Sequence, residues 1–142
     1  MSKMIFINLP VGNLPQSMAF YEALGFTNNP AFTDDNAACM VWSEAIFVMI
    51  HTHDSWRRFT DRPIPDAGSS EVMLAISVDD KPTVDALLDT VAKQGGTADI
   101  NPAMDMGFMY NRSFTDLDGH IWEAFWMDPA AADGPPDMGD AA

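Results

Sequence analysis

One carboxyl group near the end of the sequence stands out because its neighbours are apolar. Glu123 interrupts the run IWEAFWM at residues 121–127, which is apolar on both faces and is therefore expected to be a strand buried on both sides. Burial raises the pKa of a carboxyl, and a carboxyl that titrates near neutral pH can act as a general acid or base. Glu123 is thus the first candidate catalytic residue. The alternative is a structural role, in which Arg112 or a backbone or hydroxyl donor holds the carboxylate.

A second group of candidates follows the segment 101–107. Tyr110 can donate a proton, Arg112 can bind a carboxylate through two parallel hydrogen bonds, and Phe108 can contact a ligand. The preceding segment contains proline, glycine and two methionines, a composition typical of an adaptable lid. The alternative is that these side chains form the faces of an ordinary amphipathic strand.

Two histidines and one cysteine are the other side chains of chemical interest. His51 and His53 have the spacing His-x-His, which can place both imidazoles on one face of a strand as metal ligands. The favoured alternative places both at a strand end on the surface, because no acidic partner has a fixed place beside them. Cys39 is the single cysteine, which excludes an internal disulfide, and its apolar surroundings are typical of an inert core residue.

The overall composition limits the partners that the chain can have. Its 142 residues are 47% hydrophobic, enough for one domain with a core, and their formal net charge is −14. Nucleic acid and anionic membranes are poor partners for such a chain, because both attract clustered Lys and Arg. No apolar run reaches about 18 residues and no signal peptide is recognised at the start, so a soluble, cytoplasmic protein is expected.

The elements that must position these side chains come in one order, twice. In the first half, a strand is predicted at residues 3–11. A helix follows it, capped by Asn13 or Ser17 and ended by Gly25, because apolar side chains recur at helical spacing from Leu14 to Leu24. Strand-like runs follow at residues 26–32, 38–42 and 45–51, and then a short helix and a linker at 54–65. In the second half, a strand is predicted at 72–78, a helix at 82–94, and strand-like runs at 97–100, 107–115 and 120–127.

This repetition predicts an internal duplication of a βαβββ module. The modules are placed at residues 1–66 and 67–128, and together they are expected to form one compact domain, because one module alone buries only one face of its sheet. The predicted fold class is α+β, with both modules in tandem forming a curved mixed sheet. Residues 129–142 are rich in Pro, Gly, Ala and Asp and are expected to be a flexible acidic tail.

The opening and closing motifs carry a family resemblance. LPVGNL at residues 9–14 and SMAFYEALGF at 17–26 resemble the opening of the glyoxalase, bleomycin-resistance and extradiol-dioxygenase superfamily, also called the vicinal oxygen chelate superfamily. DLDGHIWE at residues 116–123 resembles the D-P-D-G-x-x-x-E ending of that superfamily. The resemblance implies paired βαβββ modules that enclose a ligand pocket and often dimerise.

The same resemblance locates the positions that bind a cation in the metal-dependent members. They correspond to Phe6, Val48, Met73 and Glu123, with Met49 in place of Val48 if the alignment slips by one residue. Only Glu123 can bind a hard divalent cation, since the other side chains carry no oxygen or imidazole donor. No cofactor and no four-ligand metal site is therefore predicted. A divalent metal held by shifted ligands, including His51 or His53, is the alternative.

If those four positions point into one chamber, strand alternation adds their neighbours to its lining. Asn8 and Glu123 would orient a ligand in mostly apolar surroundings, which suit an apolar or aromatic small molecule. The predicted ligand contacts are Phe6, Asn8, Val48, Ile50, Met73, Ala75, Phe108, Arg112, Ile121 and Phe125. A filled core without a cavity is the alternative.

Two classes of function follow from the resemblance. The first is a lyase or isomerase resembling glyoxalase, in which Glu123 moves a proton beside a carbonyl and Tyr110 assists. The second is a non-catalytic protein resembling bleomycin-resistance proteins, which sequester cationic drugs without a metal and to which the charge of −14 is suited. A divalent-metal enzyme resembling glyoxalases or dioxygenases, with shifted ligands, is a further alternative. A homodimer is expected in each case.

Overall fold

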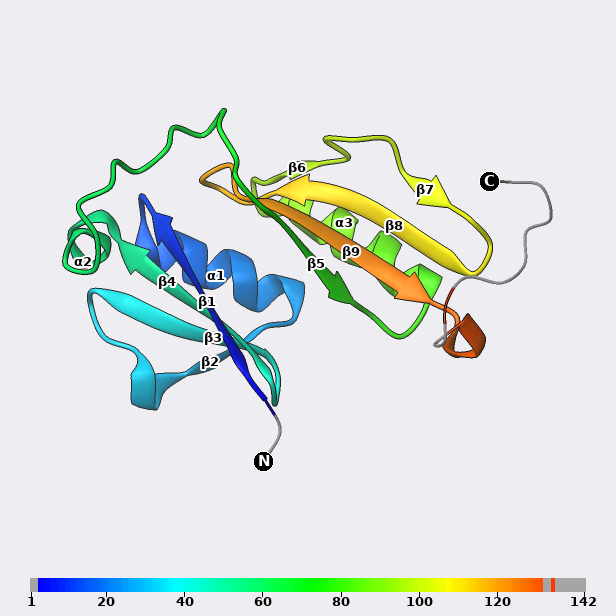
Figure 1. Cartoon of the computed structure of the whole chain (residues 1–142), viewed down its shortest axis with the longest axis horizontal. Helices are drawn as coiled ribbons and strands as arrows, with labels where there is room; N and C mark the ends of the chain where they lie inside the picture. Colours follow the sequence, from blue (N-terminus) through cyan, green and yellow to red (C-terminus); the bar gives the residue numbers. More distant parts are fainter. Residues whose placement is uncertain (1–2, 132–133, 135–142) are drawn as a thin grey trace. The chain divides into compact units, whose positions relative to one another are not determined.

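The computed structural model describes residues 3–131 and residue 134, and the chain divides into two compact units (Figure 1). The first unit contains the chain up to Glu71 together with the segment Asp116–His120, and the second contains Val72–Thr115 and the chain from Ile121 on. The division after Glu71 lies five residues beyond the predicted module boundary. The inclusion of Asp116–His120 in the first unit was not predicted.

The first unit has a four-stranded mixed sheet with strand order β1-β4-β3-β2, in which β1 and β4 are parallel and the other neighbours antiparallel. Its elements are β1 (Ile5–Val11), α1 (Leu14–Leu24), β2 (Thr27–Asn29), the 3-10 helix η1 (Pro30–Phe32), β3 (Ala37–Ser43), β4 (Ile46–Thr52) and α2 (His53–Arg57). The predicted strand, helix and three strands are confirmed in this order.

Helix α1 begins and ends where its local sequence dictates. The side chain of Asn13 accepts a hydrogen bond from the backbone N–H of Gln16, and Gly25 follows the last turn with a φ of 113°, a left-handed conformation that favours glycine. The helix covers the sheet face that carries Val48 and Ile50, and both of these side chains are fully buried. The opposite face of this sheet is left for the site described below.

The second unit repeats the topology of the first. Its sheet has the strand order β5-β9-β8-β6, with β5 and β9 parallel, and β7 pairs with β8. The elements are β5 (Met73–Ser77), α3 (Lys81–Lys93), β6 (Thr97–Ala98), β7 (Met104–Asp105), β8 (Met109–Thr115), β9 (Ile121–Met127) and η2 (Pro129–Ala131). The α+β class and the duplicated βαβββ order are therefore confirmed, and β7 is a strand where only a loop was expected.

Helix α3 packs on the sheet of the second unit through the apolar face that its sequence predicts. Asp80 caps the helix by accepting the backbone N–H of Thr83, and four apolar side chains of the helix are buried. They are Val84, Leu87, Leu88 and Val91. Phe114 and Trp122, on facing positions of β8 and β9, are buried on the same side of the sheet and stack with their ring planes 8° apart.

The turn Asp116–His120 is bonded to helix α1 and the end of β1, all within the first unit. The carboxylate of Asp116 is buried and accepts hydrogen bonds from the Tyr21 hydroxyl and from the backbone N–H groups of Asp118 and His120. Asp118 in turn accepts the backbone N–H of Gly12 at 2.7 Å. Burial raises the pKa of the Asp116 carboxyl above its usual range.

Of the tail expected from residue 129 on, Pro129–Ala131 forms a 3-10 helix in which Ala131 is buried. Residues 132–133 and 135–142 lie outside the described part of the chain. Within the described part, none of the helices combines the length and apolar character needed to cross a membrane.

Candidate functional site

The face of the first unit's sheet that lies opposite α1 carries a pair of stacked aromatic rings. Phe6 on β1 pairs in register with Phe47 on β4, and their ring centroids lie 4.4 Å apart with an interplanar angle of 9°. Asn8 pairs with Met49 in the same way, two residues further along both strands. Partner residues of neighbouring strands point to the same side of a sheet, so all four side chains share this face. We call it the open face.

A cavity of about 480 Å³ lies over the open face. It is lined by Phe6, Asn8, Asn29, Phe32, Cys39, Phe47 and Met49. Most of this lining is apolar, and the amides of Asn8 and Asn29 are its polar groups. A cavity of this size and composition suits a small, partly aromatic organic molecule.

Two neighbouring cavities share residues with the first. One, of about 370 Å³, shares Phe32 and Met49, and the other, of about 250 Å³, shares Asn8. His51 and Phe59 line both of these smaller cavities. The three hollows therefore surround the Asn8–His51 pair on one face of the first unit.

The prediction that Val48 and Ile50 share a face with Phe6 and Asn8 is wrong. Both side chains point to the opposite face of β4, where they are fully buried beneath α1. Met49, the alternative one residue on, lies on the open face. Because side chains alternate along a strand, this one-residue slip exchanges the two faces.

His51 was expected at the surface, but this residue is only 5% exposed. Its Nε2 lies 2.8 Å from the Asn8 side-chain oxygen, and its Nδ1 lies 3.0 Å from the Ser55 hydroxyl. The amide oxygen of Asn8 can only accept, so Nε2 carries the proton and Nδ1 accepts from Ser55. Burial lowers the pKa of His51 below its ordinary value of 6.5, which keeps the ring neutral.

The buried, neutral ring of His51 makes the folded state sensitive to acid. Because its pKa is lower in the folded than in the unfolded chain, the unfolded state takes up the proton first as pH falls below 6.5. The free energy of unfolding, measured with urea, is therefore expected to fall between about pH 7.5 and pH 5.5. The fall should be larger in the wild type than in His51→Gln, which lacks the titrating group. Equal losses in the two proteins would contradict this assignment.

His53 does not share a site with His51. It begins helix α2 and lines a separate cavity of about 280 Å³ with Pro10 and His120. In the described part of the chain, no group of three or more His, Cys, Asp or Glu side chains is arranged to hold a metal ion. The two histidines of the predicted His-x-His pair therefore lie in different elements, because β4 ends at Thr52 and α2 begins at His53.

Glu123 lies on β9 between Ala75 of β5 and Ser113 of β8, and it is partly exposed. The prediction of a strand buried on both sides is wrong, because α3 covers only the face that carries Trp122 and Ala124. Strand register places Met73, Ala75, Ile121 and Phe125 on the same face as Glu123. These five predicted residues do share one face of the second unit.

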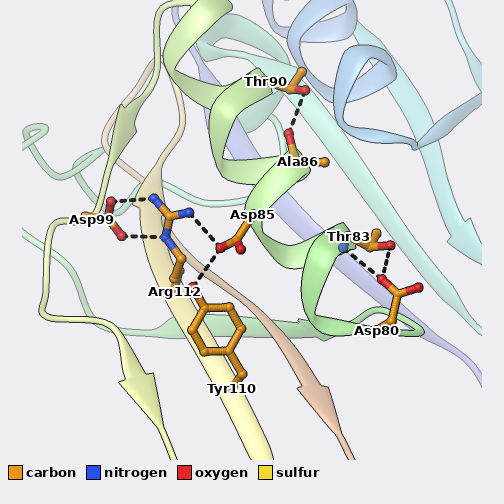
Figure 2. A network of polar contacts seen from close by, with 8 residues as sticks. All are labelled: Asp80, Thr83, Asp85, Ala86, Thr90, Asp99, Tyr110 and Arg112. Atoms are coloured by element: carbon orange, nitrogen blue, oxygen red, sulfur yellow. Dashed lines mark hydrogen bonds and ion pairs between the residues drawn. The ribbon is translucent and has the colours of Figure 1, made fainter.

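Tyr110 and Arg112 lie on the opposite face, toward helix α3 (Figure 2). The Tyr110 hydroxyl donates to Asp85 at 2.6 Å, and Arg112 donates to Asp85 at 3.0 Å and to both carboxylate oxygens of Asp99 at 2.6 and 2.9 Å. The Tyr110 hydroxyl holds the pKa of the Asp85 carboxyl below its usual range, and Arg112 does the same to that of Asp99.

This network corrects three predictions. Tyr110 cannot assist Glu123, since the two side chains leave the sheet on opposite sides, and Arg112 neither holds Glu123 nor faces a ligand beside it. Both residues attach α3 to its sheet instead. Phe108 precedes β8, is partly exposed, and its carbonyl accepts the backbone N–H of Asp128.

Comparisons with known proteins agree with this architecture. The family model described as Glyoxalase/Bleomycin resistance protein/Dioxygenase superfamily matches residues 3–124. Among solved structures, a hypothetical protein, SA1046, from S. aureus has a TM-score of 0.74 at 25% identity, covering 89% of this chain and 94% of that one. A glyoxalase-related enzyme from Fulvimarina pelagi has a TM-score of 0.73 at 21% identity, with coverage of 95% and 96%.

The fosfomycin resistance protein FosX from Mesorhizobium loti is also similar, with a TM-score of 0.65 at 15% identity and coverage of 92% and 96%. No curated protein has a significant match to the chain. At such low identities the structural likenesses establish the fold alone.

Proposed function

The chain belongs to the glyoxalase/bleomycin resistance protein/dioxygenase superfamily, and on this basis we propose that it binds a small, partly apolar organic molecule over the open face of the first unit. The observation that carries the proposal is the cavity of about 480 Å³ beside the stacked pair Phe6 and Phe47. Aromatic faces offer large contact areas to flat apolar groups. The neighbouring amide of Asn8 supplies a polar group to orient the ligand.

The divalent metal that many members of this superfamily use does not fit the residues present here. The corresponding positions carry Phe6, Val48 or the next residue Met49, Met73 and Glu123. Only the last has a hard oxygen donor, and the methionine thioethers are soft ligands. The proposed function therefore includes no step that depends on such a metal.

We propose that this binding occurs without turnover, as a sequestering role of the bleomycin-resistance kind. The formal charge of −14 favours cationic ligands, because a strongly acidic protein attracts them over long distances. The homodimer implied by the family is part of this proposal. The apolar residues Met4, Ile5 and Met73 are more than half exposed and support it, since a second copy of the chain would cover such residues.

The neutral fluorescent probe N-phenyl-1-naphthylamine tests the proposed binding. Saturable binding of one probe per chain is expected, and Met49→Trp, which fills the cavity, is expected to weaken it about tenfold or more. Met104→Trp is the matched control, because Met104 is half-exposed on β7 in the second unit and its replacement should leave the affinity unchanged. The proposal would be contradicted if the wild type showed no saturable binding, or if Met49→Trp and Met104→Trp bound the probe with equal affinity.

A second candidate function is proton transfer by Glu123. It is supported by the position of this carboxylate on a largely apolar sheet face, with Ile121 and Phe125 on either side along β9. Exchange of the proton beside a carbonyl can be followed by NMR in deuterated water, with the methylglyoxal–glutathione adduct as the first trial substrate. If the wild type exchanges it, Glu123→Gln is expected to slow the exchange about 100-fold or more.

The exposed Glu71 provides the control for this experiment, because Glu71→Gln removes the same charge elsewhere. Equal exchange rates in wild type and Glu123→Gln would exclude Glu123 as the base. Probe binding without any exchange would favour the sequestering function.

A further inference from the structure

Three side chains of the first unit, Ser55, His51 and Asn8, form a hydrogen-bonded chain, and of the three only Asn8 also lines the cavity of about 480 Å³ proposed for ligand binding. The Ser55 hydroxyl lies 3.0 Å from Nδ1 of His51, and Nε2 of His51 lies 2.8 Å from the side-chain oxygen of Asn8. A hydroxyl, an imidazole and an orienting group in this order are the arrangement that activates a nucleophile in acyl transfer. Ser55 and His51 are 4% and 5% exposed.

The tautomer of His51 is the one that this chemistry requires. The Asn8 amide nitrogen donates to the carbonyl of Phe6 at 3.4 Å, which directs the amide oxygen toward His51. Nε2 then carries the proton, and the lone pair of Nδ1 faces the Ser55 hydroxyl. The imidazole is therefore able to accept the hydroxyl proton.

The geometry around Ser55 is fixed from two sides. Its backbone N–H donates to the Thr52 hydroxyl at 3.1 Å, at the junction of β4 and α2. Its side chain lines the cavity of about 370 Å³ together with His51 and Arg58. Arg58 is exposed, and its charge interacts with the carboxylate of Asp34, which lines the same cavity. A positive charge that lines the substrate cavity can stabilise negative charge that develops on a carbonyl oxygen.

The other buried serines of the described chain lack this arrangement. The hydroxyl of Ser17 donates to Asp118, and that of Ser113 accepts the backbone N–H of Asn101. Neither hydroxyl forms a hydrogen bond with an imidazole among the described residues, so Ser55 differs from them in having a neutral base beside it.

We propose that Ser55, His51 and Asn8 form an acyl-transfer site that accepts small esters or thioesters from the adjacent cavity. Ser55 Oγ attacks the carbonyl carbon while its proton passes to Nδ1 of His51, and the bond to the leaving group breaks as that group takes the proton from Nδ1. Water then attacks the acyl-serine by the reverse route, which restores Ser55 and releases the carboxylic acid. Asn8 is a positioning residue in this reaction, since its part in the acyl transfer is to hold His51.

Reaction with p-nitrophenyl acetate tests this proposal. The expected result is a burst of p-nitrophenolate of about one equivalent, with one acetyl group located on Ser55 by peptide mass mapping. Ser55→Ala should remove the burst, and His51→Gln should slow it about 100-fold or more. Ser17→Ala, which removes a buried hydroxyl without a histidine partner, should leave it unchanged.

The role of Asn8 has its own readout. Asn8→Asp keeps an acceptor for Nε2 and adds a charge that stabilises the protonated ring, so the burst rate should be maintained or increased, whereas Asn8→Leu should lower it. A purely structural role would not distinguish these variants at equal folded fraction. Circular dichroism on each variant measures that fraction.

Two results would overturn the acyl-transfer site. One is acetyl groups on lysine, on Cys39 or on the N-terminus with none on Ser55, and the other is an equal burst from Ser55→Ala. If Ser55→Ala does not fold, Ser55→Cys replaces it: labelling at residue 55 supports the proposal, and no labelling there contradicts it. Because N-phenyl-1-naphthylamine binding is measured separately, failure of this site and failure of the proposed ligand binding are distinguishable.

Discussion

Replacing Asp116 by alanine is expected to lower the free energy of unfolding by about 3 kcal/mol, because one buried carboxylate serves three donors. Without it, the Tyr21 hydroxyl and the backbone N–H groups of Asp118 and His120 lose an acceptor that water can replace only in part. Urea unfolding followed by tryptophan fluorescence measures the effect.

Asp34 offers a matched control for this substitution. Its carboxylate also accepts two backbone N–H groups, those of Asn36 and Ala37, and these bonds hold its pKa below the usual range, but the side chain is exposed. Water can replace an exposed acceptor, so Asp34→Ala should cost a small fraction of the loss in Asp116→Ala. Similar losses in the two variants would show that burial of Asp116 does not determine its contribution.

Gly119→Ala is expected to destabilise the same turn by about 3 kcal/mol, the sum of a backbone strain and a steric clash. Gly119 has a φ of +87°, and a Cβ atom built there would lie 2.5 Å from the carbonyl oxygen of Ala67. The clash is with backbone, which cannot rotate away as a flexible side chain can. Thermal unfolding by calorimetry would show the loss as a lower Tm.

The substitution Gly107→Ala is the control that measures the backbone strain without the steric clash. Its φ of +81° is nearly the same, but an added Cβ would meet nothing within 4 Å. Gly107→Ala should therefore show the strain alone, about 1 kcal/mol. If Gly119→Ala costs no more than Gly107→Ala, the close approach of Ala67 does not constrain the turn.

The sequence predicts the elements of this fold well because their signals are local. Asn13, Gly25 and Asp80 begin or end helices through bonds to their own neighbours, and of the two predicted caps of α1 it is Asn13 that caps the helix. Strand β7 is missed because two residues that pair with β8 leave no period to recognise. The turn Asp116–His120 could not be assigned to the first unit, since its partners are about a hundred residues away in the chain.

The site is predicted less well, because it depends on which face each strand presents. Phe6 and Asn8 were placed correctly relative to each other, but the assignment of Val48 failed by one residue, and this exchanged the faces of β4. His51 follows Met49 by two positions, so the correct register would have placed it on the open face. Tyr110 and Arg112 lie four and two residues before the buried Phe114, so all three side chains share one face of β8. This spacing could likewise have predicted the orientation of Tyr110 and Arg112 toward α3.

The assignment of Asp116–His120 to the first unit means that this unit is not one continuous stretch of chain. A fragment that stops at Glu71 would contain α1 and the whole β1-β4-β3-β2 sheet, yet Tyr21 and Gly12 would have lost their carboxylate partners. The two halves of the duplicated sequence are therefore not separable by a single cut.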